Sequence, residues 1–196
     1  MSDPRSLAQG LLLAQKPARL PVRIERLRFE KSLLIDSLGH YCALTGNTLD
    51  GLTGGASAAL RDGCTLVRQR GEKRVYIILY NEGVGSTRRR NFTLAHEVGH
   101  IYLKHVRDDP AGEREADAFA AELLMPRALA AAYLQMAGNR QDPARTLSQA
   151  FGVSLGMARV GLRDIGRGES LTEREKELLV RYRVALPNPA EPEVAY

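Results

Sequence analysis

The chain has 196 residues, 44% of them hydrophobic, which is enough for one domain of ordinary size with a small appendage and no covalent cross-links. Its two cysteines lack C-x-x-C spacing, which argues against a disulfide framework and a thiolate zinc site and favours a reducing, cytoplasmic setting. The formal net charge of +5 comes from arginines spread along the chain, so charge alone does not indicate a nucleic-acid partner.

The N-terminal third is predicted to contain two helices and a loop. Residues 1–15 carry too short an apolar run for a secretory or membrane-spanning segment, and we expect a short amphipathic helix there. Apolar residues recur at helical spacing from Val22 to Leu38, which predicts a second helix. Residues 45–63 have the glycine-rich composition of a loop, with room for one helical turn from Ala56 to Leu60.

Two strands are predicted next. Residues 64–70 and 74–80 flank a short turn, and in the second segment Val75, Ile77 and Leu79 alternate with the residues between them. This pattern is typical of a strand pair. We expect residues 74–80 to form a sheet edge to which an extended substrate segment can add.

Helices are predicted over most of the remaining chain. They cover residues 92–106, 113–124, 127–137, two short stretches within 143–166, and 171–184. Pro126 stops the second of these, because proline cannot donate the helical hydrogen bond. Thr172 and Glu175 have capping-box spacing at the start of the last.

These elements predict three regions along the chain. Residues 1–140 form one domain, residues 141–185 form a small helical unit, and residues 186–196 form a flexible, proline-rich tail. No internal repeat is visible.

The small helical unit has helix-turn-helix spacing. Two short helices are expected on either side of Gly152, with Ser154 as the cap of the second. Arg159 and Arg163 would be exposed on that second helix, where weak contact with DNA is conceivable. The alternative is that the unit only packs on the preceding domain, since Gly156 and Gly161 weaken a recognition helix.

The strongest chemical signal is His96-Glu97-Val98-Gly99-His100 within a predicted helix. Residues four apart lie on one helical face, so His96 and His100 can present two imidazole nitrogens to one metal ion. Glu97 lies to one side of that face and can reach a metal-bound water as a general base. Zinc is the expected ion, because it lowers the pKa of its bound water and polarises a carbonyl.

A catalytic zinc site needs a third protein ligand, which should lie downstream. The candidates are Glu113, Glu115 and Asp117, and the helical phase favours Glu113 modestly. Asp117 would then accept the second ring proton of a ligating histidine. His105, five residues after His100, is expected to point elsewhere, and neither it nor His40 is expected to be a ligand.

The segments Asn91 to His100 and Glu113 to Pro126 resemble the ImmA/IrrE family of metallopeptidases. The resemblance implies a compact α+β, zincin-like peptidase domain with a small antiparallel sheet beside the active-site helix, followed by the helix-turn-helix-like unit. It implies a third ligand followed four residues later by an acidic or amide residue, a spacing that selects Glu113 and Asp117. It also implies an intracellular, site-specific protease that cleaves helix-turn-helix repressors.

The expected function is therefore a zinc-dependent, site-specific endopeptidase acting on a helix-turn-helix transcriptional repressor, so that mobile-element, prophage or stress genes are derepressed. The alternative is a regulatory protein that binds DNA or a repressor and has a non-catalytic zinc site. No membrane partner is expected. The sequence does not determine the oligomeric state, the cleavage site or the residue that stabilises the oxyanion.

Overall fold

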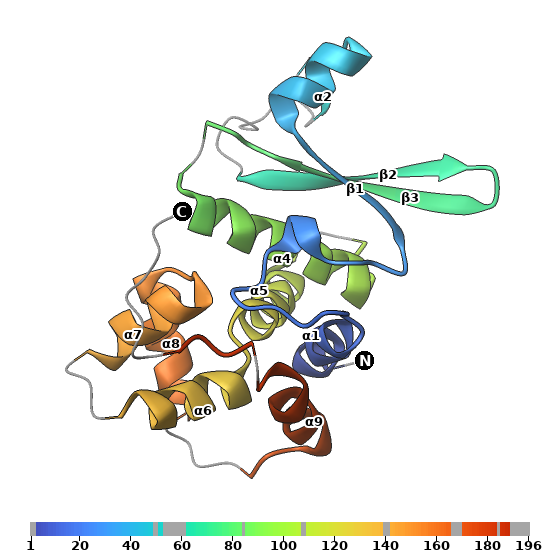
Figure 1. The fold of residues 1–196 in the computed structure, drawn as a ribbon. Coiled ribbons are helices and arrows are strands. Elements are labelled where there is room, and N and C mark those ends of the chain that lie inside the picture. Colours follow the sequence, from blue (N-terminus) through green and yellow to red (C-terminus); the bar gives the residue numbers. More distant parts are fainter. Residues whose placement is uncertain are drawn as a thin grey trace.

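The computed structural model describes residues 3–48, 51–52, 62–83, 85–106, 109–138, 142–165, 170–183 and 185–188 (Figure 1). Its elements are α1 (Pro4–Leu13), η1 (Ile24–Arg26), β1 (Ser32–Ser37), α2 (Leu38–Thr45), β2 (Gly63–Arg70), β3 (Lys73–Tyr80), α4 (Thr87–Leu103), α5 (Pro110–Leu124), α6 (Arg127–Ala137), α7 (Pro143–Phe151), α8 (Leu155–Ile165) and α9 (Glu173–Tyr182). This composition confirms the predicted α+β class. The helical turn predicted at 56–60 and residues 189–196 of the predicted tail lie outside the described residues.

The three strands form one mixed sheet in the order β1-β3-β2. Strands β2 and β3 form the predicted antiparallel hairpin, and Gly71 in its turn takes a left-handed conformation with φ of 60°. Strand β1 pairs with β3 in parallel, with Ser32 opposite Val75. The sheet is therefore not wholly antiparallel. The prediction that residues 74–80 form an edge is wrong, because β3 is central and the edges are β1 and β2.

The helix predicted from Val22 to Leu38 is also wrong, because this stretch contains the single turn η1 and the strand β1. Leu33 and Ile35 pack against the core, while Leu34 between them is 59% exposed. Burial thus alternates with the two-residue period of a strand. A short apolar run fits either period, and here pairing with β3 satisfies the backbone and decides the outcome.

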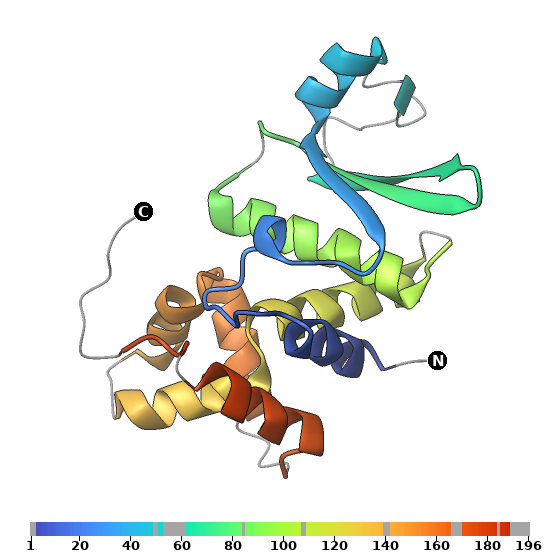
Figure 2. The same ribbon diagram turned by 45° about the vertical axis from the view of Figure 1, so that its right-hand side comes forward.

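Helix α4 lies against the sheet and packs on α5, while α1 is held between α5 and α9 (Figures 1 and 2). One hydrophobic core joins these helices to α6, α7 and α8, and its fully buried rings include Phe119, Phe151 and Tyr182. The Tyr182 hydroxyl donates to the Leu12 carbonyl at 3.2 Å, which ties the last helix to the first. The helix-turn-helix-like pair α7 and α8 therefore shares the core of the helices before it.

Two polar side chains fix where α4 begins and how it is held. Ser86 caps the helix by accepting a backbone N–H of its first turn, so α4 starts before the predicted Phe92. The buried Asn91 side chain accepts the Ile24 N–H at 3.0 Å and donates to the Val22 carbonyl at 2.8 Å. These bonds attach the segment before β1 to α4.

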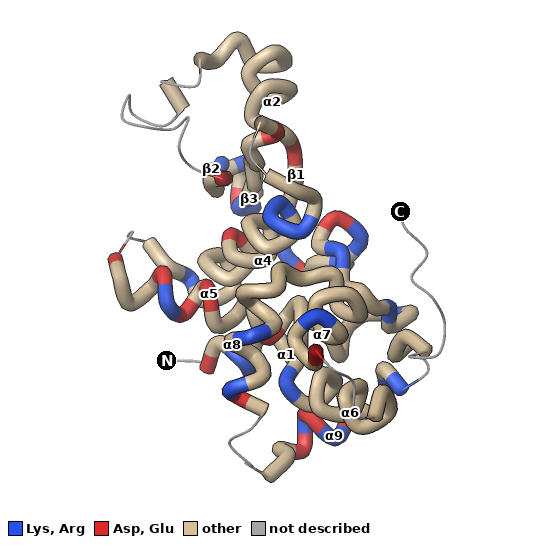
Figure 3. Tube along the Cα trace, turned by 90° about the vertical axis from the view of Figure 1, so that its left-hand side faces the viewer, with Lys and Arg blue, Asp and Glu red and all other residues tan. Residues whose placement is uncertain are grey.

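The surface carries charges of both signs. Figure 3 shows Lys and Arg interspersed with Asp and Glu on the helices, rather than separated onto different faces. None of the helices in the described part of the chain has the length and apolarity needed to cross a membrane.

Candidate metal centre

Helices α4 and α5 bring three metal-binding groups to one point. The Nε2 atoms of His96 and His100 lie 2.9 Å apart on one face of α4. From the first turn of α5, Glu113 places Oε2 3.2 Å from Nε2 of His96 and Oε1 3.4 Å from Nε2 of His100. The histidine side chains are mostly buried, whereas that of Glu113 is 49% exposed. The cluster is therefore anchored in the protein and reachable from solvent.

Gly99 lets the two helices approach closely enough to form this cluster. A Cβ atom at this position would lie 3.2 Å from the Ala116 backbone and from the Phe119 ring, which is tighter than ordinary packing. The helices thus touch at the level of Gly99 and Ala116. Glu113 stands three residues before Ala116, about one helical turn, and so reaches the histidines.

Asp117 lies behind His96 on the same helix as Glu113. Its Oδ1 atom is 2.9 Å from Nδ1 of His96. An ionised carboxylate only accepts hydrogen bonds, so Nδ1 of His96 carries the proton that faces Asp117, and Nε2, on the side of His100 and Glu113, is the nitrogen left for a metal. The tautomer of His96 is therefore the one that binds a metal through Nε2.

The donor set fits a divalent metal ion. In a tetrahedral zinc site with Zn–N bonds of about 2.0–2.1 Å, neighbouring ligand atoms lie about 3.3 Å apart. The separations of 2.9, 3.2 and 3.4 Å among His96, His100 and Glu113 are close to that value. Imidazole lone pairs and carboxylate oxygens that converge in this way are stabilised by a cation between them. Among the described residues, these three form the one cluster with metal-ligand spacing.

Glu97 is held beside the cluster by the sheet. The Thr65 hydroxyl on β2 donates to Oε2 of Glu97 at 2.6 Å. This short, charge-assisted bond fixes the orientation of the Glu97 carboxylate beside the two histidines of α4. The candidate base therefore lies between α4 and the edge strand β2.

One of three comparisons with known proteins found a match. The family model described as the IrrE N-terminal-like domain, peptidase M78, matches residues 62–163, which is more than half of the chain. The chain belongs to this family. Searches of curated proteins and of solved structures gave no significant match.

The IrrE N-terminal-like match begins just before β2 and ends within α8. It therefore contains both strands of the hairpin, the helices α4 and α5, and the three residues of the metal cluster. Membership of the family makes this a metallopeptidase-type domain. The resemblance seen in the sequence is confirmed.

One prediction about the surroundings of the cluster is wrong, and one alternative ligand lies outside the cluster. The prediction that His105 points away from His100 is wrong, because Nδ1 of His105 lies 3.0 Å from Nδ1 of His100. Glu115, an alternative third ligand, instead places Oε2 3.1 Å from Nε2 of His105. His40 is remote from both, exposed on α2 and paired with Asp36 at 2.8 Å.

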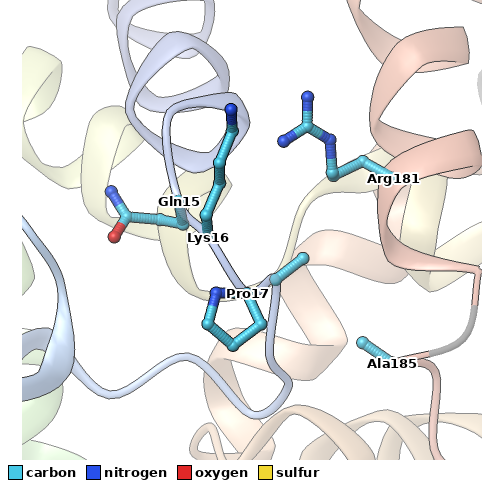
Figure 4. Close-up of a pocket in the computed structure, with 6 residues that line it drawn as sticks. Gln15, Lys16, Pro17, Arg181 and Ala185 are labelled. Atoms are coloured by element: carbon cyan, nitrogen blue, oxygen red, sulfur yellow. The ribbon is translucent and has the colours of Figure 1, made fainter.

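Two hollows lie outside the metal cluster of this IrrE-like domain. One of about 340 Å³ borders His105 and Glu115. The other, of about 390 Å³, is lined by residues just after α1 and by Arg181 of α9, and Figure 4 shows the Lys16 and Arg181 side chains beside each other there. Only the first adjoins residues that contact a metal-cluster histidine.

Proposed function

We propose that the protein is a zinc-dependent endopeptidase in which His96, His100 and Glu113 hold the metal. The observation that carries this proposal is the convergence of these three groups beside Glu97 in a peptidase-family domain. When bound, zinc would polarise the scissile carbonyl and make water acidic enough to attack near neutral pH.

Glu97 is the proposed general base. Its carboxylate takes a proton from the attacking water and then gives a proton to the leaving nitrogen as the peptide C–N bond breaks. Thr65 holds one of its oxygens, so the carboxylate keeps one orientation through both transfers. Asp117 holds the ring of His96 in the orientation and tautomer that the site requires.

The proposed substrate segment binds to β2 rather than to residues 74–80. Strand β3 is paired on both sides, whereas the outer edge of β2 pairs with no other strand of the described sheet. A peptide that adds to this edge would run beside Thr65 and so beside Glu97. Backbone hydrogen bonds would then hold the scissile bond near the metal cluster.

The proposed substrate class is a helix-turn-helix transcriptional repressor, and its cleavage would derepress mobile-element, prophage or stress genes. This part of the proposal is supported by the family resemblance alone. The test is to incubate the purified chain and zinc with the helix-turn-helix protein encoded beside it. Specific cleavage by the wild type and none by Glu97→Gln is the expected result.

A regulatory DNA-binding role is the second candidate. It is favoured by the α7–α8 pair, which turns at Gly152 with φ of 64° and leaves Arg159 and Arg163 exposed on α8. Salt-dependent binding that is lost on replacing both arginines would support it. If Glu97→Gln still switches the target genes, regulation does not need cleavage and this second candidate replaces the first.

A further inference from the structure

His105 reaches His100 because α4 ends in a left-handed turn. The helix stops at Leu103, and Lys104 has φ of 61°. The chain folds back, so that the His105 backbone N–H donates to the His100 carbonyl at 3.0 Å. The two rings then meet nearly at right angles, with 5.1 Å between their centroids. On a continuing helix, residues five apart would lie on different faces.

The contacts of His105 specify which ring nitrogens carry protons. Nε2 of His105 faces the Glu115 carboxylate at 3.1 Å, so it carries the proton and Nδ1 of His105 has a lone pair. Nδ1 of His100 lies 3.0 Å from Nδ1 of His105 and therefore donates its hydrogen to that lone pair. The remaining nitrogen of His100, Nε2, lies on the side of Glu113 and His96 and is therefore the one left for a metal.

The surroundings of His105 favour this arrangement. Its side chain is only 15% exposed, and that of Glu115 is 28% exposed, so both hydrogen bonds are shielded from competing water. A Cβ atom at Gly112 would lie 3.3 Å from Nδ1 of His105, which shows how closely α5 backs the ring. The ring therefore has little freedom to turn away from His100.

We propose that His105 and Glu115 form a positioning pair that fixes the tautomer and orientation of His100 for metal binding. The pair would do for His100 what Asp117 does for His96, except that a second imidazole stands between the carboxylate and the metal-binding ring. This inference rests on the proposed function, because it assigns a role only if His100 is a metal ligand. Neither His105 nor Glu115 touches the substrate in this account.

The test compares His105→Asn with His105→Leu in the full chain. The two side chains have the same branching and number of heavy atoms, but asparagine keeps an acceptor near the place of Nδ1 and leucine does not. Zinc affinity is measured by competition with a chelator. We expect His105→Leu to bind zinc about 10–100-fold more weakly than wild type, and His105→Asn to recover most of that loss.

The positioning role would be overturned if both His105 variants lost zinc affinity equally, or if neither lost any. Equal losses would mean that the acceptor atom of asparagine has no effect and that the ring matters only for packing. Glu115→Ala should weaken zinc binding in wild type and add little in the His105→Leu background, since the residues act as one unit. His40→Ala is the matched control and should bind zinc like wild type. If the wild type binds no zinc, or if His96→Ala still binds it, the proposed function fails. If the wild type binds zinc, His96→Ala loses it and the His105 variants bind it normally, only the positioning role of His105 and Glu115 is refuted.

Discussion

At the scale of single residues, the site depends on which atoms accept and which donate. The four-residue spacing of His96 and His100 was sufficient to predict that both face one ion. The choice between Glu113 and Glu115 was harder. The helical phase gives the direction of each side chain around its helix but not the level at which the two helices cross. The structure brings Glu113 against the histidine pair and Glu115 against His105.

The role of His105 could not be predicted, since the helix predicted over residues 92–106 runs past Leu103, where α4 ends. Nothing in the Lys104 side chain indicates a left-handed residue, which is usually glycine or asparagine. The sequence does show a histidine shortly after the H-E-x-x-H motif. Only the turn at Lys104 brings this residue, His105, against His100.

Thr65 gives a prediction about the base. Thr65→Val keeps the shape of the side chain and removes the hydroxyl that donates to Glu97. We expect kcat for peptide cleavage to fall about tenfold, equivalent to about 1.4 kcal/mol, because Glu97 loses its fixed orientation. Zinc affinity should not change. A Thr65→Val protein with normal kcat would show that this contact does not position the base.

Glu97→Gln separates binding from catalysis. The amide keeps the size of the side chain but cannot take a proton from water. Zinc content should match wild type, while the cleavage rate should fall by about 10²–10⁴-fold. An active Glu97→Gln protein would remove Glu97 from its proposed role.

At the scale of elements, sequence patterns worked best where periodicity was unambiguous. The bounds of α6 agree with prediction, and the hairpin of β2 and β3 lies within one residue of the predicted strands. Strand β1 was missed because its apolar run is short and its partner is distant in sequence, so local spacing could not show the pairing. Because β1 was not predicted, β3 was expected to pair only with β2 and to be an edge strand of the sheet.

The crossing of α4 and α5 can be tested at Gly99. Gly99→Ala adds a methyl group 3.2 Å from Ala116 and Phe119, so α5 must shift and carry Glu113 with it. We expect the free energy of unfolding to fall by about 1–3 kcal/mol, with weaker zinc binding. The measurements are urea denaturation of the metal-free chain and chelator competition.

Gly10→Ala is the matched control for Gly99→Ala. Gly10 also lies within a helix, α1, but a Cβ there meets nothing within 4 Å. This variant should be about 0.4–1 kcal/mol more stable than wild type, because alanine loses less backbone entropy on folding. A Gly99→Ala variant that behaves like Gly10→Ala would contradict the tight crossing.

At the scale of the whole molecule, one core and several long-range polar contacts join the two ends of the chain. Arg5 pairs with Asp164 at 2.9 Å, and the buried pair of Arg127 and Glu175 joins α6 to α9. The division of the chain near residue 140 stays a prediction. The shared core includes side chains from both sides of that position, such as Phe119 and Phe151.

The pair of Arg127 and Glu175 makes the free energy of unfolding depend on pH. Burial alone would raise the pKa of Glu175, but hydrogen bonds from Thr172 and Arg127 outweigh it and hold the pKa below its usual value. A lowered folded-state pKa gives stability that is present above the unfolded value, about 4.3, and is lost as the pH falls through the folded value. Burial instead raises the pKa of Glu122, whose contribution has the opposite sign.

Comparison with Glu175→Gln isolates the first of these effects. Near pH 7 this variant should be about 3–5 kcal/mol less stable than wild type, because the buried Arg127 guanidinium would lose the negative charge of Glu175. The difference should shrink as the pH falls below about 4.3. Urea denaturation at a series of pH values measures it, and a difference that stays constant would contradict the assignment.

The central claim is that His96, His100 and Glu113 bind one catalytic metal ion, and zinc content tests it most directly. Metal analysis of the purified chain should find about one zinc per molecule. His96→Ala and Glu113→Ala should each lose it, while His40→Ala should retain it. Full zinc content in both His96→Ala and Glu113→Ala would contradict the account.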